Sequence, residues 1–152
     1  MFLSTHINKV DAKGRVSVPS GFRQALANER FQGVVLFPSR QAAALEGFGL
    51  SYMEEIASRL DRFDLFSETQ DDLATVVFGE SIQLSMDGDG RIVLPPKLIE
   101  VAQLDGRAAF VGMGHKFQIW SPEALEKRKK KARGNIAEKG LTIPNPKGGA
   151  NG

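Results

Sequence analysis

The sequence predicts an α+β protein built from two copies of one small unit. Residues 10–19 read VDAKGRVSVP, and residues 86–95, seventy-six positions later, read MDGDGRIVLP. Asp, Gly, Arg and Pro recur at the same spacing, with apolar residues at matching positions between them. A repeat of this kind indicates a duplicated structural unit. The elements expected around each copy also follow one another in the same order, which supports a duplication.

Strands and short helices are expected in both halves. Alternating apolar residues bounded by turn residues predict strands over 3–7, 16–18, 34–37, 43–45, 82–86, 92–94, 108–111 and 117–120. Residues 11–14 and 87–90 read as turns, because Asp bonds forward to the backbone and Gly tolerates positive φ. Helical spacing of apolar residues predicts short helices over about 20–28 and 96–103.

The middle of the chain has a different, helical pattern. An apolar stripe follows the spacing i, i+3, i+4, i+7, i+10 and consists of Met53, Ile56, Ala57, Leu60 and Phe63. Ser51 and Glu54 resemble a capping box at its start. A second helix is expected over 70–78, ending at Gly79. We expect the stripe to pack within the subunit, or against another one.

The end of the chain is basic. Ser121 and Pro122 provide a cap and a first-turn proline for a helix that carries Lys127, Arg128, Lys129, Lys130 and Lys131. From Gly134 onward few residues are apolar, so disorder is expected. The chain is therefore divided into a first unit at 5–52, connecting helices at 53–80, a second unit at 81–124, and a basic helix and tail at 125–152.

Composition excludes several classes of protein. The 152 residues contain no cysteine, which excludes disulfides and thiol catalysis. No apolar run approaches the roughly 18 residues of a membrane span, and the N-terminus lacks the features of a signal peptide. A cytoplasmic protein without a membrane partner is expected.

The net charge of +2 is unevenly distributed. Residues 1–40 carry six Lys or Arg and two acids, whereas residues 41–80 carry two and nine. Residues 81–122 are balanced at four and four, and residues 123–152 carry eight Lys or Arg and three acids. The basic parts indicate a polyanion partner, and the acidic middle should face away from it.

Each repeated motif places an arginine one residue beyond a glycine-containing turn, at the start of a strand. An arginine there can reach a phosphate or the N7/O6 edge of guanine. Lys13 would add a phosphate contact, and Asp11 could orient Arg15 by a charge-assisted hydrogen bond. The alternative is structural, since Asp and Gly make a β-turn by themselves and Arg can pair with Asp on the surface. The duplication favours the functional interpretation.

No pattern supports catalysis or a cofactor. A calcium loop starting at Asp87 would need Gly at its sixth and Glu at its twelfth position, where Ile92 and Leu98 stand. The only histidines, His6 and His115, are far apart in sequence, which makes a metal site improbable. No phosphate-binding loop or nucleophile elbow is present. We expect neither an enzyme nor a bound cofactor.

The motifs resemble those of the MraZ transcriptional regulators. Residues 11–15 with Pro19, Phe22 and Arg23 are similar to the first family signature, and residues 87–95 with 117–122 to the second. The resemblance covers roughly residues 1–125. It implies two SpoVT-AbrB (swapped-hairpin) units that form an intertwined β-barrel with helices outside. It also implies a bacterial regulator, acting at the promoter of its own division and cell-wall gene cluster, assembled as a ring that binds short direct repeats in double-stranded DNA at the nucleoid.

The resemblance also implies roles for individual residues. Arg15 and Arg91 would contact bases or phosphates, oriented by Asp11 and Asp87. Lys13 and Arg23 would support them, but their counterparts in the second copy are Asp89 and Ile99. We therefore expect the first copy to carry more of the affinity. The run from Lys127 to Lys131 lies beyond the part of the chain that the resemblance covers. It is either a solvated helix face or a source of non-specific contacts with DNA.

Two other functions remain open. One is a nucleoid-associated or RNA-binding protein that uses its basic parts without sequence preference, although no aromatic platform for stacking bases is visible. The other is an antitoxin-like module that binds a protein partner. Its tail would have to fold on that partner, and this tail is basic and poor in apolar anchors.

Overall fold

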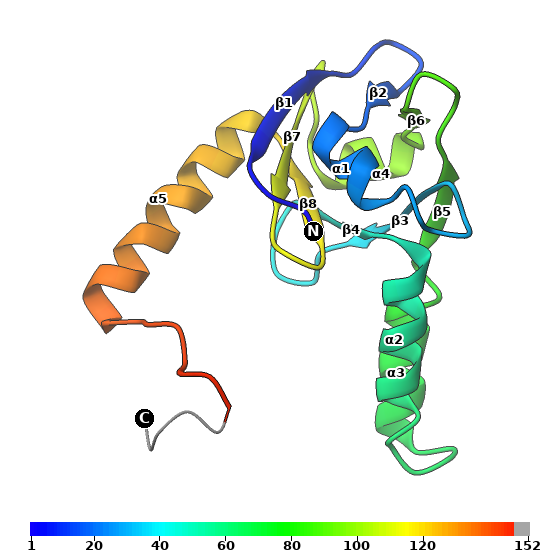
Figure 1. The fold of residues 1–152 in the computed structure, drawn as a ribbon, viewed down its shortest axis with the longest axis vertical. Coiled ribbons are helices and arrows are strands. Elements are labelled where there is room, and N and C mark those ends of the chain that lie inside the picture. Colours follow the sequence, from blue (N-terminus) through cyan, green and yellow to red (C-terminus); the bar gives the residue numbers. More distant parts are fainter. Residues whose placement is uncertain (148–152) are drawn as a thin grey trace. The chain divides into compact units, whose positions relative to one another are not determined.

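The strands of the computed structural model, which describes residues 1–147, form two antiparallel sheets (Figure 1). The larger sheet has the strand order β1-β7-β8-β4-β3-β5. Its strands are β1 (Thr5–Lys9), β7 (Arg107–Gly112), β8 (Phe117–Trp120), β4 (Leu45–Phe48), β3 (Gly33–Pro38) and β5 (Ile82–Ser85). The smaller sheet is a ribbon of two strands, β2 (Arg15–Ser17) and β6 (Arg91–Val93).

The two halves of the sequence are interleaved within these sheets. β1 pairs with β7, β3 with β5, β4 with β8 and β2 with β6, so each pair joins one strand from each half. The predicted α+β class is confirmed. The expected closed barrel is not found among the described pairings, because the order of the larger sheet ends at β1 on one side and β5 on the other.

Strand register shows a local two-fold relation between the halves. In the ribbon, Val16 lies opposite Ile92, its own counterpart seventy-six residues on, and Arg15 and Ser17 lie opposite Val93 and Arg91. A rotation about the Val16–Ile92 pair therefore exchanges the two copies of the motif.

A side-chain hydrogen bond also joins the two halves in the larger sheet. Glu46 of β4 lies opposite Gln118 of β8, and the Nε2 of Gln118 donates a hydrogen bond to Glu46 at 2.9 Å.

Two short helices occupy equivalent places after the ribbon strands. α1 (Ser20–Ala25) and α4 (Pro96–Val101) both follow a proline at the N-cap. Both end earlier than the predicted 28 and 103. One residue beyond each C-cap, Ala27 bonds to the Gln24 carbonyl and Gln103 to the Glu100 carbonyl, each three positions back, so the chain tightens there and does not form another α-helical turn.

The main core is built around aromatic rings from distant parts of the chain. The Phe22 ring of α1 lies 5.2 Å from those of Phe2 and Phe117 and 6.1 Å from that of Phe110. Its side chain is 1% exposed. Leu98, which occupies the equivalent position in α4, is buried in the same core. Each short helix is thus held in place by one side chain in the main core, Phe22 in α1 and Leu98 in α4.

The predicted central helices are present as α2 (Leu50–Leu60) and α3 (Glu68–Val77), which run side by side (Figure 1). The predicted stripe is buried at Met53 and Leu60, while Phe63 lies beyond the helix and is exposed. The capping box was wrong, because the N-cap of α2 is Gly49. The Glu29 carboxylate instead accepts bonds from the backbone N–H of Ser51 at 2.9 Å and from its hydroxyl at 2.5 Å.

The C-terminal helix α5 (Pro122–Lys139) belongs mainly to a second compact unit that begins at Glu123. It begins where predicted, but residues 134–139 are helical and not disordered. A glycine costs a helix interior only about 1 kcal/mol, so Gly134 does not end it. The helix ends at Gly140, with φ +60°, and the N–H of Leu141 bonds to Ile136 O at 3.1 Å as in a Schellman motif.

Residues 141–147 have no regular secondary structure, and the expectation for 148–152 lies outside the described residues. Within residues 1–147, no helix is both long enough and apolar enough to span a membrane.

Replacing Phe22 with alanine is expected to lower the free energy of unfolding by about 3–5 kcal/mol, because a buried ring surrounded by three others leaves a cavity. Urea denaturation of the purified protein measures this change. Phe66→Ala is the control, since that ring is 83% exposed, and it should change the free energy by no more than about 0.5 kcal/mol. Equal effects of the two substitutions would contradict the placement of Phe22 at the centre of the core.

Candidate nucleic-acid interface

The first turn is organised by the carboxylate of Asp11. Its Oδ1 accepts hydrogen bonds from the backbone N–H groups of Lys13 and Arg15, both at 2.9 Å. Its Oδ2 accepts a bond from Nε of the Arg15 side chain at 2.7 Å. The carbonyl of Asp11 also accepts a bond from the Gly14 N–H at 3.0 Å. One aspartate thus shapes the turn and fixes the base of the arginine side chain.

The second turn repeats this arrangement. Asp87 Oδ1 accepts bonds from the N–H groups of Asp89 at 2.9 Å and Arg91 at 3.0 Å, and its Oδ2 accepts a bond from Arg91 Nε at 2.9 Å. The second turn has one additional ion pair, because Nη2 of Arg91 lies 3.3 Å from Asp89 Oδ2. The position equivalent to Asp89 in the first turn is Lys13, whose side chain is exposed.

Each turn is tied to the strand of the other half through its glycine. Gly14 and Gly90 have φ values of +84° and +76°, which side chains other than glycine rarely adopt. The Gly14 carbonyl accepts a bond from the Leu94 N–H at 2.8 Å, and the Gly90 carbonyl one from the Val18 N–H at 2.9 Å. A Cβ atom on Gly14 would lie only 2.5 Å from the Leu94 carbonyl oxygen. Gly14 is therefore required by both conformation and space, and Gly90 by conformation.

The ribbon places the two arginines on one face. Side chains alternate between faces along a strand, and directly opposite residues share a face. Arg15, Ser17, Arg91 and Val93 therefore lie on the outer face, while Val16 and Ile92 lie on the inner face, where both are buried. The side chains of Arg15 and Arg91 are 42% and 39% exposed. The Arg15–Val93 pair and the Ser17–Arg91 pair are two residues apart, or about 7 Å along the strands.

Hydrogen bonding keeps both turn aspartates ionised. The backbone N–H of Arg15 is the main cause that lowers the pKa of Asp11 below its ordinary value, followed by the Arg15 side chain. The pKa of Asp87 is lowered mainly by the backbone N–H of Arg91. Both carboxylates therefore carry a full charge at neutral pH and hold the arginine side chains by charge-assisted bonds.

Arg23 lies against the second turn. Its side chain is partly buried, and its Nη1 donates a bond to the Val18 carbonyl at 3.2 Å. Its Cδ would lie 2.4 Å from a Cβ added to Gly90, so it lies directly against the second turn. Ile99, its counterpart, lies in the same way against Gly14. The geometry gives Arg23 a bracing contact, and a role in DNA contact stays a prediction.

The sequence interpretation missed Ser17 and Val93. Both lie on the outer face beside the arginines, and Val93 is 54% exposed although it is branched and apolar. The alternation in residues 91–94 contains this signal, since it places Val93 on the same face as Arg91.

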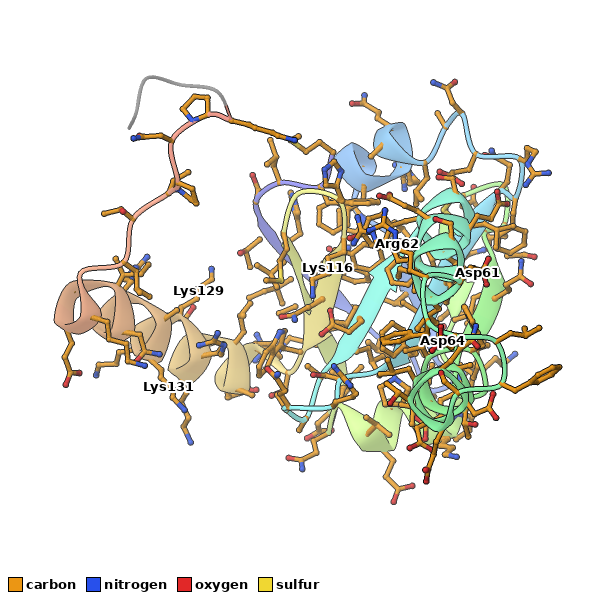
Figure 2. The ribbon with its side chains drawn as sticks, turned by 90° about the horizontal axis from the view of Figure 1, so that it is seen from below. Asp61, Arg62, Asp64, Lys116, Lys129 and Lys131 are labelled. Atoms are coloured by element: carbon orange, nitrogen blue, oxygen red, sulfur yellow. The ribbon has the colours of Figure 1, made fainter. Side chains whose placement is uncertain are left out.

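The basic run lies in α5, as predicted. Successive residues in a helix are separated by about 100°, so the five consecutive cations from Lys127 to Lys131 are distributed around the whole helix. Lys129 and Lys131 can be followed on this helix in Figure 2. Such a helix presents positive charge in every direction and not along a single face.

The connection between α2 and α3 is acidic. In sequence it reads Asp, Arg, Phe and Asp at positions 61–64, and Asp61, Arg62 and Asp64 are labelled in Figure 2. Within residues 1–147 no group of three or more His, Asp or Glu side chains could hold a metal ion.

An antiparallel two-stranded ribbon with exposed arginines is the kind of element that enters the major groove of DNA. The fold and site thus define a small α+β protein with a candidate β-ribbon nucleic-acid interface. Residues 77–140 match the family model described as "MraZ protein, putative antitoxin-like". The chain is 41% identical over 145 residues to a protein named "Transcriptional regulator MraZ" from Rickettsia akari (strain Hartford). It is 42% identical over 145 residues to the protein of that name from Rickettsia rickettsii (strain Sheila Smith). Each match covers 95% of this chain and 97% of the relative. The chain belongs to the MraZ family, which confirms the resemblance.

Titration of Asp11, followed by NMR of its carboxyl carbon, is expected to give a midpoint below the ordinary value of 3.8. In Arg15→Ala the pKa should rise only part of the way, because the backbone N–H of residue 15, the main cause, remains. A group with a lowered folded-state pKa stabilises the fold above its unfolded pKa, and this stabilisation is lost as the pH falls through the folded pKa. The turn should therefore loosen only in acid below about pH 4.

Arg62→Ala is the control for this titration, because it removes the same charge from the connection between α2 and α3. It should leave the Asp11 midpoint unchanged. An Asp11 midpoint at or above the ordinary value would contradict the hydrogen bonding of the turn.

Proposed function

We propose that this chain is a sequence-specific DNA-binding transcriptional regulator and that the outer face of the β2–β6 ribbon reads the DNA. The observation that carries the proposal is that Arg15 and Arg91 project from one face of a two-stranded ribbon, each held at its base by an aspartate. The names of the relatives support it, since both are called transcriptional regulators.

The aspartates prepare the arginines for contact with bases. Arg15 donates to Asp11 only through Nε, so the two terminal nitrogens remain as donors at the end of the side chain. Arginine donates two parallel bonds to O6 and N7 of guanine in the major groove. A side chain that is already oriented loses less conformational entropy when it binds. Guanine is thus the base that Arg15 is best suited to contact.

The two turns differ in charge. Asp11, Lys13 and Arg15 sum to +1, whereas Asp87, Asp89 and Arg91 sum to −1. In the second turn the Arg91 side chain is also shared between two carboxylates. Phosphates surround any base in a groove, so the first turn approaches DNA more favourably. We assign the larger share of the affinity to Arg15, with Lys13 as an additional phosphate contact.

The basic helix α5 supplies attraction without sequence preference. Lys127, Arg128, Lys129, Lys130 and Lys131 are spread around the helix and do not form one shaped surface, which suits phosphates and not base edges. This contribution should fall as salt concentration rises, because binding releases counterions from the DNA.

The wider biological setting follows from the family and is part of the proposal. The two repeats, at 5–52 and 81–124, are proposed to be SpoVT-AbrB-like units, joined by helices at 53–80 and followed by the basic segment at 125–152. Subunits would assemble as a ring whose ribbons bind short direct repeats at the promoter of the protein's own division and cell-wall genes. The protein would act at the nucleoid, in the cytoplasm.

The alternative functions make different demands on the structure. Recognition of single-stranded RNA needs exposed aromatic rings beside basic residues. Among the described residues, the most exposed ring, that of Phe66, lies in the connection between α2 and α3, beside acidic residues and not on the ribbon. An antitoxin-like module would bind a protein partner in place of a specific duplex, and the binding measurements below distinguish the two. The absence of catalysis stays a prediction.

Arg15→Ala should weaken binding to the DNA upstream of the protein's own gene by about 1–3 kcal/mol, roughly 5- to 150-fold, because a bidentate contact to a base is lost. Arg91→Ala should cost less, since the second turn is acidic. Fluorescence anisotropy with this DNA and a scrambled duplex of the same length measures both effects.

Arg62→Ala removes an equal charge far along the chain from both motifs and serves as the control. It should leave binding within about twofold, which is about 0.4 kcal/mol. An Arg15→Ala protein that binds the native DNA like wild type would overturn the role assigned to the ribbon.

Replacing the five cations from Lys127 to Lys131 with glutamine should weaken binding to native and scrambled DNA by the same factor. It should also reduce the slope of log affinity against log salt by about 0.9 for each of these cations that contacts a phosphate. Anisotropy measured at several salt concentrations gives both quantities. If the substitution removed the preference for native DNA while Arg15→Ala did not, α5 would be the reader of sequence.

A further inference from the structure

We infer that Val93 is a specificity-determining residue that contacts the 5-methyl group of a thymine beside the guanine contacted by Arg15. This inference rests on the proposed function, because it concerns the same face of the ribbon. It assigns a role to a residue outside the repeated Asp, Gly and Arg positions. The observation behind it is an exposed branched apolar side chain, 54% accessible, directly opposite Arg15 in the strand register.

Core packing does not account for Val93. The alternation of the strand places Ile92 and Leu94 on the inner side, where they are 0% and 1% exposed. Val93 is on the outer face with Arg91 and is not part of the hydrophobic core. In a groove the partner that suits such a side chain is the thymine methyl group, the apolar group on the major-groove edges of the bases.

The register places this contact next to the guanine. Cβ atoms of directly opposite residues in an antiparallel pair lie about 4.5–5.5 Å apart. That spacing is close to one or two base-pair steps of about 3.4 Å. Arg15 and Val93 can therefore contact neighbouring base pairs. The second cross-strand pair, Arg91 with Ser17, lies about 7 Å further along, or about two steps away.

The two-fold relation within the ribbon makes the difference between Val93 and Ser17 important. Rotation about the Val16–Ile92 pair exchanges Arg15 with Arg91, so the arginines alone would read a site the same way in both orientations. The same rotation exchanges Val93 with Ser17, which is hydroxylic and accepts any base. The apolar side chain therefore gives one end of the site a thymine preference that the other end lacks. A ribbon with local two-fold symmetry can in this way select one orientation on DNA.

The probe for the test is a duplex that wild-type protein selects from a random 20-base-pair pool. Each thymine is then replaced, one at a time, by deoxyuridine, which removes only the methyl group. The guanine that Arg15 contacts is identified as the one whose replacement weakens binding of wild type but not of Arg15→Ala. Replacing the thymine next to this guanine with deoxyuridine should lower the affinity of wild type about fourfold, the value of one buried methyl group. Val93→Ser should bind thymine and uracil versions of this position equally, at about the wild-type level for uracil.

Two further variants serve as matched controls. Val93→Thr keeps one methyl group and the β-branch, so it should keep part of the discrimination. Ser17→Val places the same side chain at the equivalent position, and it should create sensitivity to uracil at the other end of the site. Circular dichroism and thermal unfolding establish that each variant is folded, which is expected because positions 17 and 93 lie on the outer face.

The outcomes separate this inference from the proposal beneath it. Wild type that selects a duplex, loses affinity in Arg15→Ala, and is insensitive to every uracil would overturn the role of Val93 and leave the reading ribbon intact. Sensitivity that persists in Val93→Ser would also overturn it. A random pool that yields no preferred duplex, or an Arg15→Ala protein that binds it normally, would mean that the proposed function itself fails.

Discussion

The pairing of β2 with β6 is the constraint on which the candidate site depends. Each strand has three residues and comes from a different half of the chain, and an isolated two-stranded ribbon is at best marginally stable in water. It persists here because its inner pair, Val16 and Ile92, is buried in the main core. The carbonyl of each turn glycine also bonds to the strand of the opposite half. The arginine-bearing face therefore exists only when both halves fold together.

The two copies have kept what lies inside and changed what lies outside. The inner positions remain apolar, and Asp, Gly and Arg recur because the turn geometry and the crossed hydrogen bonds require them. Buried differences, as between Phe22 and Leu98, keep the apolar character, and changes of charge occur at exposed positions, as with Lys13 and Asp89. Beneath the glycines the same space is filled by the stem of Arg23 in one copy and by Ile99 in the other. The two copies thus share their apolar inner positions and turn residues, whereas their outer surfaces differ.

The sequence predicted local features well and distant ones poorly. The turns and most strands lie within one or two residues of their predicted places, because Asp, Gly and alternating apolar residues act locally. The capping box failed because the group that caps α2 is Glu29, 22 residues before Ser51. The contact of Arg23 with Gly90 also depends on pairing between the halves. That pairing is a long-range property that no local pattern contains, although the alternation in β6 did place Val93 on the outer face.

The turn aspartates Asp11 and Asp87 orient the arginines, but they also weaken the attraction of the ribbon for phosphates. An exposed ion pair contributes little to stability, at most about 1 kcal/mol, so stability alone does not explain why both turns have one. A carboxylate also repels phosphates, and it reduces the attraction that an arginine would otherwise offer to DNA. The gain is orientation, since three bonds to one carboxylate fix both the turn and the base of the side chain. In the proposed function the ribbon therefore supplies selectivity with little net charge. In the same proposal, the attraction that the ribbon lacks would come from the seven Lys and Arg residues of α5, which outnumber its three acids.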